Sequence, residues 1–274
     1  MSEFTDKLRA SQKKSDSWVC VGLDPVMDRL PQAARTAEEH PFLAFSRAIV
    51  RSTAGVASAY KPNLAFWLAE GPAGLSALQQ LIREVPDGTP VLLDAKFNDI
   101  GNTAQAYART AFETLAVDGV TTNPYLGVDG IGPFLADGSR AAFILARTSN
   151  ASAPDLQDRL VDGLPLYETV AELAAEWNAH FPGTCGLVVG ATYPEELARL
   201  RRLAPSLPFL IPGIGAQGGN LDAAVSAGPT VDGVGPLINS SRGIIYASSG
   251  PDFADAARQA AENLRDRINQ LREV

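Results

Sequence analysis

Three charged side chains lie close together in residues 92–103 (LLDAKFNDIGNT). Asp94 and Lys96 follow an apolar run and are two residues apart, so on a β-strand both side chains point to the same face. Nearby negative charge keeps a lysine protonated, and a positioned ammonium group can donate a proton. Asp99 follows the expected strand end, before a helix that residue 102 or 103 would cap. The stretch predicts proton-transfer chemistry, although a salt bridge that only shapes a loop has the same pattern.

Short apolar strands and amphipathic helices alternate along the chain, as in a parallel sheet that helices cover. Strands are expected at 18–24, 58–66, 90–96, 119–124, 141–148, 185–192, 208–215 and 233–239. Helices are expected at 42–56, 75–82, 104–117, 130–136, 170–181, 195–204, 221–227 and 253–271. This α/β pattern favours a closed (β/α)8 TIM barrel over an open doubly wound sheet. We expect residues 1–274 to form a single domain, with 1–16 as a polar, helical lead-in.

Polar side chains recur at the ends of the first five expected strands. In a (β/α)8 barrel these ends meet at one mouth, where the active site is built. Besides the charged residues of 92–103, the candidates are Asp24, Lys61, Asn63, Asn123 and Ser149. Each alone would be an ordinary cap or loop residue, but their recurrence predicts one shared site. Residues 149–163 are too long for a tight turn and are a candidate lid.

Two loops in the second half are typical of a phosphate site. The glycine-rich run PGIGAQGG at 212–219 would let backbone N–H groups approach a ligand, with Gly215 in the turn and the Gln217 amide beside it. The run NSSRG at 239–243 places Arg242 at an expected helix start. Many barrels hold a phosphate on the loops after strands seven and eight, which is where both runs lie.

Composition and charge exclude several classes of function. The net charge of −8 argues against nucleic acid as the main partner. Cys20 and Cys185 are too few for a disulfide scaffold, and His40 and His180 are far apart, so we expect no metal site. No run is apolar enough for a membrane span or a signal peptide, and we expect a cytoplasmic protein that does not bind membranes.

The run 94–103 (DAKFNDIGNT) resembles the Asp-x-Lys-x-x-Asp signature of the orotidine 5′-phosphate decarboxylase family, followed by that family's Ile-Gly-Asn-Thr. The resemblance extends over nearly the whole chain. The further matching stretches are Leu-Asp at Asp24, Tyr-Lys-Pro-Asn at Lys61, Arg-Thr-Ser-Asn at 147–150, the glycine-rich run at 212–219 and Ser-Ser-Arg at Arg242. The last three, with the chain length, resemble the longer bacterial subgroup. At Phe97 and Asn98 the chain departs from the Arg-Gly of that subgroup, and Phe97 resembles the eukaryotic-type branch instead.

The resemblance implies an enzyme that converts orotidine 5′-monophosphate (OMP) to UMP and CO2 in pyrimidine biosynthesis, without metal or cofactor. It implies that Lys96 protonates C6 of the pyrimidine and that Asp94 lies near the departing carboxylate. Lys61 and Asp24 would hold the ribose hydroxyls and the charge network.

The same resemblance assigns further contacts. Ser149 would contact the pyrimidine, and Gln217 and Arg242 would bind the phosphate. Asp99 and Thr103 would reach into the neighbouring subunit's site, which implies a homodimer.

Three other functions stay open from the residues. A Mg²⁺-dependent sugar-phosphate decarboxylase or synthase could share the Asp-x-Lys-x-x-Asp frame, but its metal needs a further acidic ligand at the strand ends. A Schiff-base aldolase needs a neutral amine, whereas Lys96 is flanked by carboxylates. A barrel that only binds phosphate, as a sensor or scaffold, would not need Asp94, Lys96 and Asp99 together.

Overall fold

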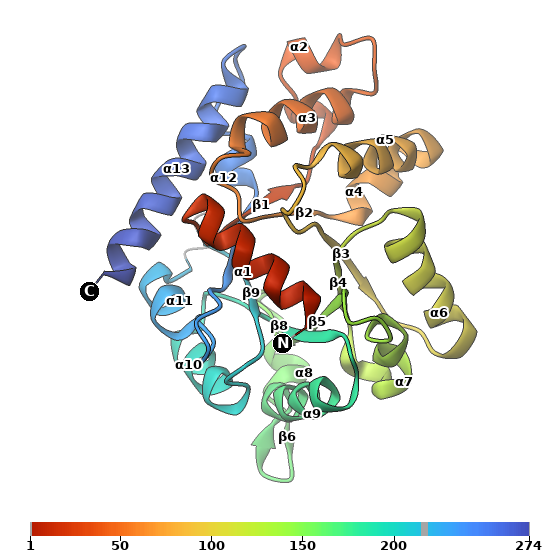
Figure 1. The fold of residues 1–274 in the computed structure, drawn as a ribbon, viewed down its shortest axis with the longest axis vertical. Coiled ribbons are helices and arrows are strands. Elements are labelled where there is room, and N and C mark those ends of the chain that lie inside the picture. The colour runs from red at the N-terminus through yellow and green to blue at the C-terminus, as the bar shows by residue number, and fades with distance from the viewer. Residues whose placement is uncertain (1, 215–218, 274) are drawn as a thin grey trace.

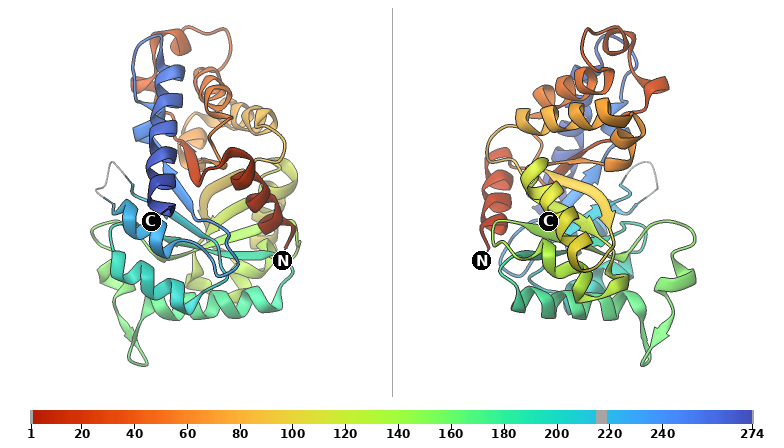
Figure 2. Two further views of the ribbon diagram at one scale, coloured as in Figure 1. Left: turned by 60° about the vertical axis from the view of Figure 1, so that its left-hand side comes forward. Right: turned by 90° about the vertical axis from the view of Figure 1, so that its right-hand side faces the viewer.

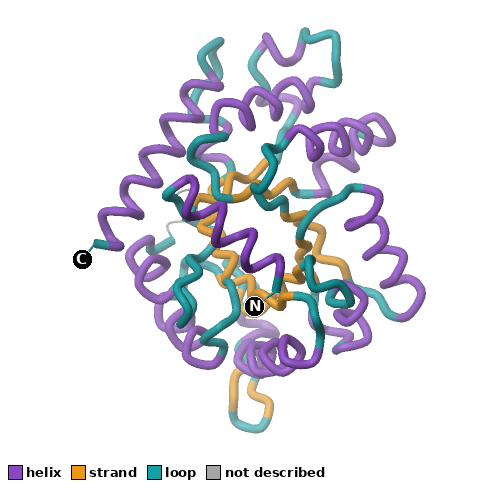
Figure 3. Tube along the Cα trace, in the orientation of Figure 1, coloured by secondary structure: helices purple, strands orange, loops and turns teal. Residues whose placement is uncertain are grey.

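The computed structural model describes residues 2–214 and 219–273. Within them, eight parallel strands follow the order β2-β1-β10-β9-β8-β5-β4-β3. Isolated parallel bridges join Tyr60 to Val91 and Asn63 to Asp94, so β2 and β3 meet and the sheet closes. A ring of helices surrounds the ring of strands (Figures 1 and 3). The predicted (β/α)8 barrel is therefore confirmed.

The strands of the ring lie close to their predicted positions. They are β1 (Val19–Leu23), β2 (Ala59–Pro62), β3 (Leu92–Phe97), β4 (Gly119–Thr122), β5 (Ala141–Arg147), β8 (Thr184–Val189), β9 (Phe209–Pro212) and β10 (Leu237–Ser240). A separate antiparallel hairpin of β6 (Leu160–Val161) and β7 (Leu164–Pro165) projects away from the barrel (Figure 2).

Helices of different lengths connect the strands. The longer ones are α1 (Glu3–Ser15), α3 (Pro41–Thr53), α5 (Gly71–Glu84), α6 (Gly101–Arg109), α9 (Leu166–His180), α10 (Pro194–Leu203), α11 (Leu221–Ala227) and α13 (Phe253–Arg272). The shorter ones are α2 (Gln32–Arg35), α4 (Leu64–Ala69), α7 (Val128–Ile131), α8 (Pro154–Gln157) and α12 (Arg242–Ile245), with single turns η1 (Met27–Arg29), η2 (Thr110–Thr114, π-helical), η3 (Pro124–Leu126) and η4 (Gly132–Phe134). None of the helices that the structure describes has the length and apolar character needed to cross a membrane.

Both faces of strand β1 are buried. In β1, Cys20 packs inside the ring with Leu92 and Phe143, whereas Val19 and Val21 pack outward in the core beneath the helices. A strand buried on both faces reads as a continuous apolar run, which is why periodicity alone shows no alternation in β1. Polar side chains are then tolerated mainly at the strand ends, where the ring opens.

Helix α1 closes the barrel at the end where the strands begin (Figure 1). Phe4 and Leu8 join the apolar residues inside the ring, and the Phe4 ring meets the edge of Phe143 at a centroid distance of 5.9 Å. The Gln12 side chain donates to the Gly235 carbonyl at 2.9 Å and accepts from the Gly235 N–H at 3.0 Å. The predicted helical lead-in is thus a plug that leaves one open end, at the carboxyl termini of the strands.

Several local predictions were wrong. The strand expected at 58–66 ends at Pro62, because the Asn63 side chain caps helix α4, which begins at Leu64. The helix expected at 130–136 is replaced by two short pieces, α7 and η4, because Pro133 lacks a backbone donor and Gly130 and Gly132 are poor helix formers. Helix α6 has Ile100 as its N-cap without a side-chain bond, so neither Asn102 nor Thr103 caps it. Gly101, with a φ of 55°, lets the chain turn into the helix before those two residues.

Candidate active site

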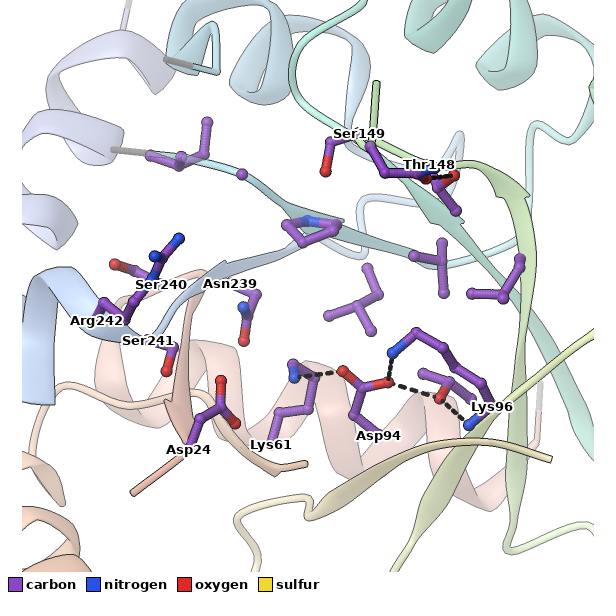
Figure 4. Close-up of a pocket in the computed structure, with 18 of the residues that line it drawn as sticks. Asp24, Lys61, Asp94, Lys96, Thr148, Ser149, Asn239, Ser240, Ser241 and Arg242 are labelled. Carbon is purple, nitrogen blue, oxygen red and sulfur yellow. Dashed lines mark hydrogen bonds and ion pairs between the residues drawn. The ribbon is translucent and has the colours of Figure 1, made fainter. Parts of the chain in front are cut away.

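A cavity of about 490 Å³ opens at the carboxyl-terminal ends of the barrel strands. Figure 4 shows side chains from both halves of the chain that point into it. The candidates from the sequence that line it are Asp24, Lys61, Asp94, Lys96, Ser149 and Arg242. Its size suits a small organic ligand. These six candidates therefore lie around one cavity.

Asp94 lies between the two lysines (Figure 4). Its Oδ2 atom accepts a hydrogen bond from Lys61 Nζ at 2.9 Å, and its Oδ1 atom accepts one from Lys96 Nζ at 2.5 Å. The lysines differ in exposure, because 49% of the Lys96 side chain is accessible but only 5% of the Lys61 side chain. Lys96 is therefore the ammonium group that can reach a ligand, whereas Lys61 holds Asp94 from beneath.

The buried pair is ionised. Burial by itself lowers the pKa of Lys61, but the carboxylates of Asp94 and Asp24 outweigh it and raise that pKa above its ordinary value. Burial by itself raises the pKa of Asp94, but the ammonium groups of Lys61 and Lys96 bring it far below its ordinary value. At neutral pH the centre of the site thus holds alternating positive and negative charges.

The Lys96 backbone leaves the regular strand geometry. The register between β3 and β4 shifts between Leu93 and Phe97, and Lys96 has a φ of 51°. The N–H groups of Ala95 and Lys96 both bond the Thr121 hydroxyl, at 3.0 and 2.9 Å. Asp94 and Lys96 do meet, as the two-residue spacing predicts, but across a bulge rather than along a regular strand.

Arg242 lies on the opposite side of the pocket from Lys96, at the start of α12 (Figure 4). Near it, three buried polar atoms have no hydrogen-bond partner within the described part of the chain: Asp24 Oδ1, Asn239 Oδ1 and Ser241 Oγ. Buried polar atoms are normally paired in a folded protein. This end of the pocket is therefore prepared to bind a polar ligand.

Side-chain contacts join the segment after β5 to the end of that strand. The Thr148 N–H donates to Gln157 Oε1 at 2.9 Å, and Gln157 Nε2 donates to the Thr148 hydroxyl at 2.7 Å. Buried Arg147 forms an ion pair with Asp158 at 2.9 Å. The candidate lid at 149–163 contains α8 and most of the hairpin, and these contacts fasten it beside Ser149.

Some candidates lie outside the pocket. Asn63 and Asn123 use their side-chain oxygens to cap α4 and η3, and neither lines the cavity. Asp99 is half-buried and Thr103 is exposed, and neither lines the cavity. Gly215 and Gln217 lie outside the described residues.

Two polar residues of the cavity were not singled out from the sequence: Thr121 and Gln157. Thr121 lies inside the apolar strand β4, where nothing in the sequence marks it as functional. Gln157 is the last residue of α8, within the polar stretch 149–163, where its type and spacing give no signal of their own.

Comparison with known proteins identifies the family. Residues 17–259 match the model of the orotidine 5′-phosphate decarboxylase / HUMPS family. The chain belongs to this family. The orotidine 5′-phosphate decarboxylase of Ralstonia pickettii is 48% identical over 98% of this chain and 99% of its own length. That of Roseiflexus sp. is 50% identical over 97% of both chains. The solved structure of Leishmania donovani OMP decarboxylase has a TM-score of 0.85 at 42% identity and covers 100% of both chains.

The departure from the expected subgroup motif lies away from the pocket. Phe97 is buried and stacks on Tyr107 and Phe134, with centroid distances of 4.6 and 5.8 Å. It does not line the cavity. In this chain, Phe97 therefore contributes to packing under α6 and does not contact a ligand in the pocket.

Proposed function

We propose that this chain catalyses the decarboxylation of OMP to UMP and CO2, the reaction named for its relatives. The observation that carries the proposal is the Lys96 ammonium group, bound to Asp94 and half exposed in a cavity with Arg242 at its other side. The substrate is taken from the relatives at 48% and 50% identity, which are named orotidine 5′-phosphate decarboxylases. The product UMP places the reaction in pyrimidine biosynthesis.

The chemistry needs one proton at one carbon. The bond from C6 to the carboxylate breaks, CO2 leaves, and the electron pair stays on C6. Lys96 donates its proton to that carbon as the charge develops and recovers a proton from water afterwards. Asp94 holds the ammonium group in place. A charge that is already in position stabilises the developing negative charge more strongly in a site that excludes water than it would in bulk water.

The remaining contacts orient the substrate. In this proposal the phosphate is bound by Arg242, Gly215 and Gln217. Asp24 accepts a hydrogen bond from a ribose hydroxyl, and Ser149 contacts the pyrimidine, since both residues line the cavity. Binding energy from the remote phosphate can then be used at the reacting carbon. Contacts of Asn63 and Asn123 with substrate stay a prediction, since their oxygens already cap α4 and η3.

A homodimer is part of the proposal. Asp99 and Thr103 lie on a surface with exposed apolar side chains on the neighbouring loops, namely Ile100, Tyr125, Leu126 and Val128. The Asp99 carbonyl lies 3.0 Å from the position of a Cβ on Gly130, so the Asp99 loop packs against α7. An exposed apolar patch of this kind supports a protein interface. In that interface Asp99 and Thr103 would reach the partner's pocket.

Location and domain organisation are also proposed. Cys20 and Cys185 are both buried and free, which suits a reducing compartment such as the cytoplasm. Gln12 of α1 bonds Gly235, and Asp16 pairs with Arg272 of α13, which supports one domain over the whole chain.

The test is OMP consumption measured by ultraviolet absorbance with EDTA present. Turnover should survive chelation in the wild type and fall by about 10³-fold or more in Lys96→Ala, because the proton donor is removed. Lys13→Ala, an exposed lysine on α1, is the control and should match the wild type. Absence of turnover by folded wild-type protein would contradict the proposal, and loss of turnover with EDTA would favour the Mg²⁺-dependent alternative.

A further inference from the structure

The Thr121 hydroxyl makes three hydrogen bonds beneath the pocket. It accepts from the backbone N–H groups of Ala95 and Lys96, at 3.0 and 2.9 Å, and donates to Asp94 Oδ1 at 2.9 Å. A hydroxyl has one proton and two lone pairs, so the two N–H groups occupy both lone pairs. The direction of its proton is therefore fixed toward Asp94.

These bonds coincide with the irregular backbone of Lys96. A lysine with a φ of 51° is unfavourable by itself and persists only where the surroundings hold it. The Thr121 oxygen binds two successive N–H groups of β3, which a regular strand would direct to opposite sides. Thr121 is 1% exposed, so water does not replace these bonds readily.

We propose that Thr121 is a positioning residue for the reaction. One hydroxyl fixes both the backbone from which Lys96 extends and the carboxylate oxygen to which its ammonium group binds. The kinetic consequence rests on the proposed function, because it assumes that Lys96 donates the proton. A displacement of about 1 Å in a reacting group is enough to lower a rate about 10²-fold.

The next residue in the strand is a matched control. Thr122 is also fully buried, but successive side chains of a strand point to opposite faces, so it points away from the pocket. Its hydroxyl has no hydrogen-bond partner among the residues that the structure describes. Thr122→Val therefore removes a buried hydroxyl of the same strand without changing the support of Lys96.

The experiment compares Thr121→Val, Thr121→Ser and Thr122→Val with the wild type. We expect Thr121→Val to lower kcat about 30-fold, which corresponds to about 2 kcal/mol in activation free energy. The Kd for UMP should change by less than about threefold, since the phosphate and ribose contacts remain. Thr121→Ser keeps the hydroxyl and should restore kcat to within about threefold, and Thr122→Val should match the wild type.

Three outcomes would overturn the proposal. They are a kcat of Thr121→Val close to that of the wild type, an equal loss of kcat in Thr122→Val, or a loss of kcat accompanied by equally weakened UMP binding that serine does not rescue. Crystal structures of the wild type and Thr121→Val separate this proposal from the proposed function. Absence of OMP turnover in the wild type would contradict the proposed function but would not test the positioning role. A shifted Lys96 side chain in the Thr121→Val structure would support that role, and an unmoved Lys96 would refute it.

Discussion

The Asp94 carboxylate compensates the charges of two lysines in the site. It accepts from the ammonium groups of Lys61 and Lys96 and from the hydroxyl of Thr121. Lys61 is nearly inaccessible, so its charge depends on Asp94 for compensation. When one partner of a buried ion pair is removed, the other is left as an uncompensated charge.

We expect Asp94→Asn to lower the free energy of unfolding by about 3 kcal/mol at pH 7. The lowered pKa of Asp94 means that its contribution is present above its unfolded pKa of about 4 and is lost as the pH falls below that value. The raised pKa of Lys61 means that its contribution is complete below its unfolded pKa of about 10.4 and is lost as the pH rises through its folded pKa. Urea denaturation at several pH values measures the difference from the wild type.

The difference should be nearly constant between about pH 5 and 9 and shrink in acid below about pH 4. Asp129→Asn, an exposed carboxylate, should show no such difference. A variant as stable as the wild type at pH 7 would show that the pair is not buried in solution.

At the scale of elements, the segment after β5 is held by its own side chains. Gln157 bonds both the backbone and the hydroxyl of Thr148, and Asp158 pairs with Arg147 one residue earlier. These two contacts join the end of α8 to the end of β5. They fix Ser149, the next residue along, at the wall of the pocket.

We expect Gln157→Leu to raise the KM for OMP about tenfold with a smaller change in kcat, since Ser149 loses its support while the proton donor stays in place. The variant also leaves the Thr148 N–H without its acceptor, so the free energy of unfolding should fall by about 1 kcal/mol. Steady-state kinetics and thermal unfolding measure the two effects. Gln259→Leu, on the exposed face of α13, should change neither. An unchanged KM would mean that Ser149 is positioned without Gln157.

Elements could be predicted from the sequence where neighbouring residues determine them, and could not where distant residues do. The barrel strands could be predicted because a strand buried on both faces must be apolar along its length. The bulge at Lys96 could not, because it depends on a hydroxyl 25 residues later in β4. Thr121 and Thr122 are equivalent in the sequence, and only the register of the closed sheet shows which of them faces the pocket.

At the scale of the whole molecule, the pocket and the proposed dimer surface lie on neighbouring loops. Asp99 is three residues after Lys96, yet it does not line the cavity of its own chain. If it completes the partner's site, each pocket contains residues from two chains. Two variants inactive for different reasons would then complement each other.

We expect Lys96→Ala and Asp99→Ala to be inactive alone and to regain about a quarter of wild-type activity when they are mixed and allowed to exchange subunits, since half of the dimers are hybrids with one intact site each. Mixing without exchange is the control. Sedimentation measures the dimer itself. A monomer with full activity would contradict this arrangement.

The plug formed by α1 sets an order for folding. Gln12 bonds Gly235 across a separation of 223 residues, and Asp16 contacts Arg272 across a separation of 256. Phe4 and Leu8 can be buried only after strands from the whole ring have assembled. Helix α1 is synthesised before the strands that bury it and is therefore among the last elements to dock, so its apolar face stays exposed until the ring has assembled.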